Sequence, residues 1–190
     1  LFGQRLLHDA VDAGATLLDS TITTDPILKG GFITGVAVKD MRTGSKSQLQ
    51  SKVVVDASGF TAVLRKKLPR EIRIDSSVSN EDVEACYREI RVLARVDVNL
   101  KFCEIYLDQT VSPRGYYWIF PGGQNMVNVG LGVCMSNGFP NPKNQLYKEV
   151  LSQPMFKSST LVKGGAWYVP TRRPLDCMTG NGIVMVGDSA

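Results

Sequence analysis

Several features that would mark particular classes of protein are missing from this sequence of 190 residues. It contains one histidine, His8, and four cysteines, none of them in a CxxC pair, so a zinc site has little support and no metal is expected. No apolar run approaches the roughly 20 residues that a membrane-spanning helix needs. The sequence shows no positively charged segment followed by an apolar core, so no signal peptide is visible. Scattered single cysteines are typical of small buried side chains in a reducing compartment, which predicts a cytoplasmic protein.

A strong excess of one charge is also missing. The net charge is +4, and the basic residues form only short clusters at 65–67 and 172–173, which indicates solvated faces rather than a nucleic-acid partner. The hydrophobic share of 43% and the charged share of 21% are those of an ordinary globular protein. The first residues already resemble the inside of a helix, and the last ones stop at a strand-to-turn junction. We therefore expect the chain to be a fragment of a longer protein.

The first third of the sequence predicts a helix followed by a β-meander. Residues 2–13 place apolar side chains on one helical stripe. Residues 15–22, 30–40 and 47–56 predict strands, the last with a β-branched run typical of a strand covered on both faces. Residues 61–68 predict a short helix that ends at a proline.

The rest of the sequence predicts mostly strands. Residues 83–98 fit either a helical or an alternating period, and their β-branched end favours a strand. Residues 101–108 alternate clearly, and residues 115–133 predict a hairpin with a glycine-rich turn at 121–124. A helix is expected at 143–152 and a late strand at 160–170.

Two strand ends lead into turns of small residues. In VVVDASGFTAVLRKKL the turn holds Ala57, Ser58 and Gly59, whose small side chains would let a phosphate or ribose approach the backbone N–H groups. In GIVMVGDSA the strand delivers Gly187 and Asp188, whose carboxylate could accept a hydrogen bond from a sugar hydroxyl. Each has a plain structural alternative: a tight strand-to-helix turn for the first, and a helix N-cap aspartate for the second.

The predicted hairpin carries two rows of residues at period two. One row is aromatic, and the other is made of small residues that would leave a smooth hollow for a flat ring or a long apolar chain. Aromatic side chains that simply cover glycines in a sheet are the structural alternative. Strand register decides whether the rows share a face, and it stays open at this point. The rows are Tyr116, Trp118 and Phe120, and Asn128, Gly130 and Gly132.

Together and in this order, these segments resemble the FAD-dependent geranylgeranyl reductases, within the flavoproteins of the p-hydroxybenzoate hydroxylase fold. DASGFTAVLR, residues 56–65, resembles that group's second fingerprint, in which a small-residue turn abuts the flavin cofactor. Residues 172–190 resemble its third fingerprint, in which Gly-Asp contacts the FAD ribose. Residues 115–132 resemble the YxWxFP…NVGxG segment of the reductases themselves. Gly3 stands where the family usually has aspartate, and the family's GxGxxG loop is absent from these residues.

The resemblance implies an α/β protein, more closely α+β, with pieces of an FAD-binding domain around a mostly antiparallel substrate domain. Residues 1–68, which include the β-meander, and 169–190 would belong to the FAD-binding domain, and residues 69–168 to the substrate domain. The two rows of the hairpin would contact substrate. The implied cofactor-binding residues are Ala57, Ser58, Gly59, Gly187 and Asp188.

The implied activity is the reduction of isoprenoid double bonds in a lipid or its precursor. Reduced FAD would deliver a hydride, with NAD(P)H or another reductant as the electron donor. The partner would be an isoprenoid lipid, which places the protein in the cytoplasm or at the periphery of the membrane.

Two alternatives stay open. An FAD-dependent monooxygenase or halogenase of the same fold, acting on an aromatic substrate, would share both turns but not the aromatic segment. A lipid-binding domain without redox activity would bind no flavin. No side chain stands out as a proton donor: His8 is interpreted as a surface or packing residue of the first helix, and Tyr117 and Cys134 are candidates without further support.

Overall fold

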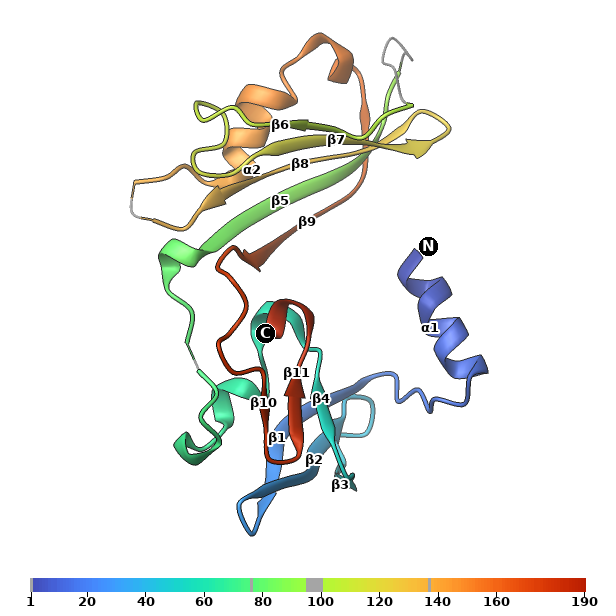
Figure 1. Ribbon diagram of the computed structural model, residues 1–190. Coiled ribbons are helices and arrows are strands. Elements are labelled where there is room, and N and C mark those ends of the chain that lie inside the picture. The colour runs from blue at the N-terminus through green and yellow to red at the C-terminus, as the bar shows by residue number, and fades with distance from the viewer. Residues whose placement is uncertain (1, 76, 95–100, 137) are drawn as a thin grey trace. The chain divides into compact units, whose positions relative to one another are not determined.

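Two compact units make up the chain, and the first of them is discontinuous in sequence. It consists of Leu1–Ser76 and Leu175–Ala190, whereas Ser77–Pro174 form the second unit. Both combine short helices with mostly antiparallel strands, so the fold is α+β (Figure 1). The computed structural model describes residues 2–75, 77–94, 101–136 and 138–190.

The first unit contains a three-stranded antiparallel meander, as the sequence predicted, but the strand predicted at 47–56 is wrong as one strand, because Lys46–Gln50 belongs to the meander and Val54–Asp56 to another sheet. The strands of the meander are β1 (Thr21–Lys29), β2 (Phe32–Asp40) and β3 (Lys46–Gln50), in that order. The strand predicted from residue 15 is wrong as far as residue 20, because β1 begins at Thr21. The β1–β2 reversal lies at Gly30 and Gly31, with φ of 58° and 79°, and this tight turn sets which residues of β1 pair with β2.

A second small sheet of the first unit joins the two ends of its sequence. β11 (Ile183–Met185) pairs in parallel with β4 (Val54–Asp56) and antiparallel with β10 (Thr179–Gly180). The core beneath it contains eight buried side chains, and those of Ile33, Val54 and Ile183 come from three different strands. Parallel pairing of segments so distant in sequence is therefore part of what holds the unit together.

The first unit contains less helix than expected. The helix predicted at 2–13 is confirmed as α1 (Phe2–Asp12), and its described residues are exposed. The helix predicted at 61–68 is wrong, because 3₁₀ turns at Gly59–Thr61 and Arg65–Lys67 take its place. Ala62, between them, is in the left-handed conformation with φ of 44°, which no α-helix tolerates.

The second unit is built on one five-stranded antiparallel sheet (Figure 1). The strand order is β6-β7-β8-β5-β9, so the ambiguous segment after residue 82 is a central strand. Its last four predicted residues, 95–98, lie outside the described residues. The strands are β5 (Val83–Val92), β6 (Glu104–Tyr106), β7 (Tyr117–Gly123), β8 (Met126–Cys134) and β9 (Thr160–Pro170).

The predicted β7–β8 hairpin is present, but its turn lies later than the glycines suggested. Gly123 still pairs with Met126, and the reversal occurs at Gln124 and Asn125. Both have positive φ, 46° and 64°, as a two-residue type I′ turn requires. Pro121 and Gly122 remain within the strand.

One face of the sheet forms the core of the second unit. Val127, Val129 and Leu131 of β8 are 0% exposed on this face. They pack against the segment of α2 (Pro142–Gln145) and the π-helical turn Leu146–Val150, which together account for the predicted helix at 143–152. The alternate residues of the strands point to the opposite face of the sheet, because side chains alternate along a strand.

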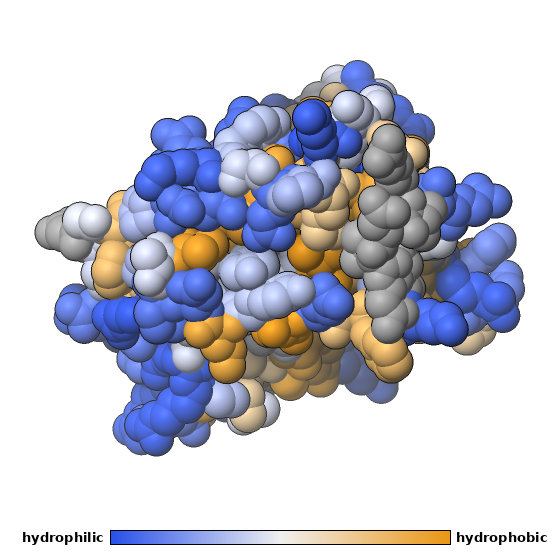
Figure 2. All heavy atoms as spheres, turned by 90° about the horizontal axis from the view of Figure 1, so that it is seen from above, coloured by the Kyte–Doolittle hydropathy of each residue, from blue (hydrophilic) through white to orange (hydrophobic). Residues whose placement is uncertain are grey.

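Hydrophobic side chains remain at the surface among the hydrophilic ones, as the view in Figure 2 shows. In the second unit they include Phe102, Leu107 and Val162, with exposed fractions of 64%, 78% and 58%. Among the described residues, no helix is both long and apolar enough to span a membrane.

A glycine in the β10–β11 turn provides a test of the first unit. A Cβ at Gly182 (φ +78°) would lie 2.0 Å from the Ile33 carbonyl oxygen, whereas one at Gly44 (φ +76°) would have no atom within 4 Å. Both alanine variants should lose about 1–2 kcal/mol of unfolding free energy through the left-handed backbone. Gly182→Ala should lose a further 1–3 kcal/mol or so through the clash. Urea denaturation measures both variants, and equal losses would contradict the packing of this turn on Ile33.

Candidate functional site

The two turns that the sequence singled out lie next to each other in the first unit. β4 and β11 are paired in parallel, with Val54 opposite Ile183 and Asp56 opposite Met185. The Val186 N–H donates to the Asp56 carbonyl oxygen at 3.1 Å. Ala57–Gly59 and Gly187–Asp188 therefore follow the carboxyl ends of neighbouring parallel strands, the place where open α/β sheets bind ligands.

Asp56 holds the first of these turns in shape. Its side chain is 2% exposed, and its carboxylate accepts hydrogen bonds from the backbone N–H groups of Ser58, Leu64 and Arg65, at 3.0, 3.1 and 3.1 Å. The Ser58 hydroxyl donates to the same carboxylate and accepts from the Val63 N–H at 2.8 Å. The side chain of Ser58 is thus occupied within the turn, which leaves backbone groups to meet a ligand.

The glycines of both turns border open space. Gly59 and Gly187 have φ of +68° and +63°, and a Cβ on either would have no atom within 4 Å. A cavity of about 310 Å³ beside the first turn is lined in part by Ile22, Ala57 and Ser58. These turns therefore expose backbone that a bound group can approach closely.

Asp188 does not act as the cap of the turn that contains it. The 3₁₀ turn Gly187–Ser189 begins after Val186 and has no side-chain cap. Asp188 is exposed and has no hydrogen bond or ion pair with any described residue. Its side chain is exposed, whereas that of Asp56 is buried and hydrogen-bonded within its own turn.

In the second unit, the register places both sequence-predicted rows on one face of the sheet. Trp118 lies opposite Gly130, and Phe120 opposite Asn128. The Gly132 N–H donates to the Tyr116 carbonyl oxygen at 3.0 Å, which continues the same pairing. The six residues that the sequence grouped are thus together, on the face opposite the core. We call this surface the aromatic face.

The glycines of the aromatic face make room for specific side chains rather than for an empty trough. A Cβ at Gly130 would lie 2.5 Å from Trp118 Cζ2 and 2.8 Å from Arg88 Cβ. The Trp118 Nε1–H donates to Asn128 Oδ1 at 3.2 Å, which fixes the indole over β8. A large side chain at position 130 would displace Trp118, so the space beside Gly130 is filled by the indole and is not an empty trough.

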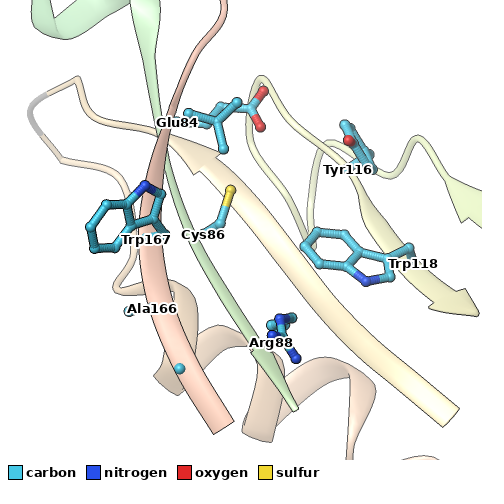
Figure 3. Close-up of a pocket in the computed structure, with 9 residues that line it drawn as sticks. Glu84, Cys86, Arg88, Tyr116, Trp118, Ala166 and Trp167 are labelled. Atoms are coloured by element: carbon cyan, nitrogen blue, oxygen red, sulfur yellow. The ribbon is translucent and has the colours of Figure 1, made fainter. Parts of the chain in front are cut away.

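A pocket of about 420 Å³ opens on the aromatic face (Figure 3). Both tryptophans of the chain, Trp118 of β7 and Trp167 of β9, line it. β5 crosses between them and contributes three alternate side chains with three different chemistries, a carboxyl, a thiol and a guanidinium. The pocket is lined by Glu84, Cys86, Arg88, Tyr116, Trp118, Gly165, Ala166, Trp167 and Val169.

Sequence reasoning missed Glu84, which lies at one end of this pocket. A Cβ at Gly132 would be 2.6 Å from Glu84 Oε2, so the carboxyl group occupies space that any side chain at position 132 would take. The side chain of Glu84 has no hydrogen bond or ion pair with any described residue. Burial raises the pKa of this carboxyl group above its usual range. The signal was present in the sequence as the alternation of Glu84, Cys86 and Arg88, but the ambiguous period of the segment obscured it.

The neighbours of Glu84 stay protonated. Burial, and next the charge of Glu84, raise the pKa of the Cys86 thiol to about 11. The pKa of Tyr116 is raised by the same two causes and by Cys86. Neither group therefore supplies a thiolate or phenolate at neutral pH, and the pocket is a mainly apolar site with one polar group at each end.

The core face of the same strand carries a satisfied carboxylate. Glu89 is 0% exposed and accepts hydrogen bonds from the hydroxyls of Tyr87 and Tyr147, at 2.9 and 2.8 Å. Arg91 forms an ion pair with it and also donates to Ser159 Oγ at 2.8 Å. Burial, together with the bond to Glu89, raises the pKa of Tyr87 to about 12. Because each of its partners is in place, this cluster fixes β5 against its neighbours.

The three residues considered as proton donors line neither cavity. The side chain of His8 is 79% exposed on α1. Tyr117 belongs to the core face and stacks on Tyr106 with ring centroids 4.4 Å apart. Cys134 is 3% exposed, with its sulfur near the Ser136 hydroxyl. Within the described ranges, no group of three His, Cys, Asp or Glu side chains could hold a metal ion.

Comparison with known proteins finds one family model that matches most of the second unit. Residues 82–169 match the family described as the geranylgeranyl reductase catalytic domain. The chain is 41% identical over its whole length to a digeranylgeranylglycerophospholipid reductase of Sulfolobus acidocaldarius, of which it covers 42%. It is 30% identical to digeranylgeranylglycerophospholipid reductase 2 of Methanococcoides burtonii, of which it covers 45%. The chain thus spans less than half the length of these curated relatives.

Solved structures share the fold of the whole chain. A geranylgeranyl bacteriochlorophyll reductase-like protein from Thermoplasma acidophilum superposes with a TM-score of 0.86 at 24% identity, covering 100% of this chain and 46% of that one. A flavin-dependent brominase superposes with a TM-score of 0.68 at 19% identity, covering 99% of this chain and 47% of that one. The α+β fold predicted from the sequence is therefore confirmed, and it is one that flavin-dependent enzymes use.

The raised pKa of Glu84 predicts how stability depends on pH. Between the ordinary carboxyl pKa and the raised one, the folded protein binds more protons than the unfolded chain, so stability falls as pH rises through that window. Glu84→Gln carries no charge and removes this loss. The variant should therefore melt at a higher temperature than the parent at about pH 7, with a smaller difference at about pH 4.

Thermal melts at the two pH values measure this effect. Glu71→Gln, which alters an exposed carboxyl group of the first unit, is the matched control and should show no such dependence on pH. A Glu84→Gln variant that is equally or less stable than the parent at neutral pH would contradict the half-buried, unpartnered environment of the Glu84 side chain.

Proposed function

We propose that the chain forms part of an FAD-dependent enzyme that reduces isoprenoid double bonds in lipids or their precursors, because residues 82–169 match the geranylgeranyl reductase catalytic domain and the whole chain is similar to reductases of this kind. The observation that carries the proposal is the aromatic pocket on the face opposite the core of the second unit. It is built by the segment that matches the catalytic domain of the family.

The turns of the first unit fit a flavin nucleotide. Gly59 and Gly187 expose backbone without side chains, and the unpartnered Asp188 carboxylate can accept a hydrogen bond from a ribose hydroxyl. Asp56 and Ser58 would hold the cradle in shape from within. Bound and reduced, FAD supplies the hydride. The residues that we propose to bind the cofactor are Ala57, Ser58, Gly59, Gly187 and Asp188.

The aromatic pocket fits an apolar chain better than a small polar substrate. Its volume of about 420 Å³ lies in the range of small-molecule sites. Trp118, Trp167 and Tyr116 provide broad apolar walls, against which a chain gains about 0.8 kcal/mol for each methylene-sized group it buries. With the thiol of Cys86 protonated, the middle of the pocket carries no charge.

A halogenase or monooxygenase of the same fold is the second candidate, favoured by the superposition on the brominase. That likeness at 19% identity concerns the fold alone. The family match over residues 82–169 and the tryptophan-lined pocket in that segment favour the reductase.

The proposal extends to the partners of the enzyme. NAD(P)H or another two-electron donor would reduce the flavin. The relatives are named after a glycerophospholipid, and such a substrate would bring a cytoplasmic enzyme to the periphery of the membrane. No nucleic-acid partner is proposed.

Anaerobic assays of the full-length protein test the function. Chemically reduced enzyme should add two hydrogens to each reduced double bond of a geranylgeranyl lipid, as detected by mass spectrometry. Purified protein without flavin absorbance would instead favour a lipid-binding domain. A halogenated or hydroxylated aromatic product, with geranylgeranyl lipid left unchanged, would favour the second candidate.

Removing the indole of Trp118 should weaken binding of the isoprenoid chain. Trp118→Ala takes away one wall of the pocket, and we expect binding of geranylgeraniol to weaken by roughly 1.5–3 kcal/mol, with flavin retained. Titration by calorimetry measures both ligands. Phe102→Ala, which removes a 64% exposed aromatic ring outside the pocket, is the control. Equal losses in the two variants would place the chain elsewhere.

The two aspartates of the first unit should behave in opposite ways. Asp188→Ala should weaken FAD retention by about 1.5–3 kcal/mol, the value of a hydrogen bond to a charged group, and leave the melting temperature of the apo protein unchanged. Asp56→Ala should lower that melting temperature, because it leaves buried N–H groups without an acceptor. If Asp188→Ala lowers the melting temperature and spares FAD, Asp188 has a structural role.

A further inference from the structure

The two ends of the aromatic pocket differ in charge. Glu84, Cys86 and Arg88 are alternate residues of β5 on one face, with the thiol between the carboxyl group and the guanidinium (Figure 3). Glu84 and Arg88 are four steps apart along the strand, which corresponds to about 13 Å. The walls between them are the rings of Trp118 and Trp167. The pocket is thus an apolar slot with an acid at one end and a cation at the other.

Arg88 is the end that can receive an anion. The guanidinium forms no ion pair or hydrogen bond with any described residue, and Arg88 is exposed. Its planar fork of N–H donors matches a phosphate geometrically. An anion at the other end would lie beside the unpartnered carboxyl group of Glu84, which disfavours it by repulsion when ionised. The charges therefore favour one orientation of a ligand that is anionic at one end.

We propose that Arg88 recognises the phosphate or diphosphate group of an amphipathic isoprenoid ligand, whose chain runs past Trp118 and Cys86 toward Glu84. This inference rests on the proposed function, because it assumes that the pocket holds the isoprenoid chain. It adds that the pocket orients the ligand and prefers an anionic one over a neutral one. The phosphate can belong to a lipid headgroup or to a free prenyl diphosphate.

Fluorescence titration of the full-length protein tests the preference. Both tryptophans of this chain line the pocket, so ligands should change their emission. The probes are geranylgeraniol, geranylgeranyl diphosphate and a digeranylgeranylglyceryl phosphate. We expect at least one anionic probe to bind roughly tenfold or more tighter than the alcohol, as for a hydrogen bond to a charged group. Which of the two binds tighter identifies the source of the phosphate.

Arg88→Gln should remove this preference and leave the affinity for geranylgeraniol within about twofold. Arg88→Lys should retain part of it, because the charge stays while the fork is lost. The matched control is Lys163→Gln: Lys163 lies on the same face, opposite Ile90, but does not line the pocket. It should keep the full preference. Since Arg88 is exposed, its variants should melt at the temperature of the parent.

Three outcomes would overturn the inference. The first is that the alcohol and both anionic probes bind the parent with equal affinity. The second is that Arg88→Gln keeps the preference for an anionic probe. The third is that Lys163→Gln and Arg88→Gln lose the preference equally, which would point to the general positive charge of the surface. In each of these cases the isoprenoid probes still bind to the protein, so the proposed function stands. If none of the three probes binds, the proposed function fails together with the inference.

Discussion

The register of β8 between β5 and β7 is the constraint on which the second unit depends. It places Gly130 opposite both Trp118 and Arg88. A Cβ at this position would clash with both of these side chains. The absence of that atom lets the indole pack over the strand, where Trp118 forms one wall of the pocket. The same register sends Val129 and Leu131 into the core. The pocket and the core are therefore two consequences of one pairing.

Asp56 has a comparable role in the first unit, by a different kind of interaction. A buried carboxylate in water-poor surroundings is costly unless its oxygens are fully hydrogen-bonded. Here three backbone N–H groups and a hydroxyl satisfy them, and the turn that follows β4 closes around the side chain. The chain is then free to present Gly59 without any side chain of its own in the way. Because the turn itself supplies the hydrogen bonds of the Asp56 carboxylate, the backbone at Gly59 is left facing outward with no side chain over it.

The sequence alone was sufficient to predict the parts of both sites but not how they meet. Alternation along a strand identifies which residues share a face, so the rows around Trp118 and Gly130 were visible without a structure. Whether two strands present those rows on the same side depends on register, which the hairpin turn at Gln124 and Asn125 decides. The parallel pairing of β4 with β11 joins segments too distant in sequence for any local pattern to indicate it.

Glu84 and the turn after β4 show a second limit of prediction from the sequence. A glutamate in a segment of ambiguous period has no assigned face, so its place in the pocket could not be inferred. The apolar spacing of residues 61–68 predicted a helix, which the structure does not contain. The carboxylate of Asp56 instead takes up the N–H groups of Leu64 and Arg65 that such a helix would have used. Tertiary hydrogen bonds decided what local propensity could not.

The two glutamates of β5 make the strand intolerant of mispairing. Glu84 and Glu89 are five positions apart and so point to opposite faces, one toward the pocket and one into the cluster of Tyr87, Tyr147 and Arg91. A slip of one residue would turn every side chain of β5 over. Arg88 and Glu84 would then enter an apolar core without partners, and Glu89 would leave its tyrosines. The shifted register is thus disfavoured by the free-energy cost of burying unpaired charges. The charged residues of β5 therefore help to specify its correct pairing during folding.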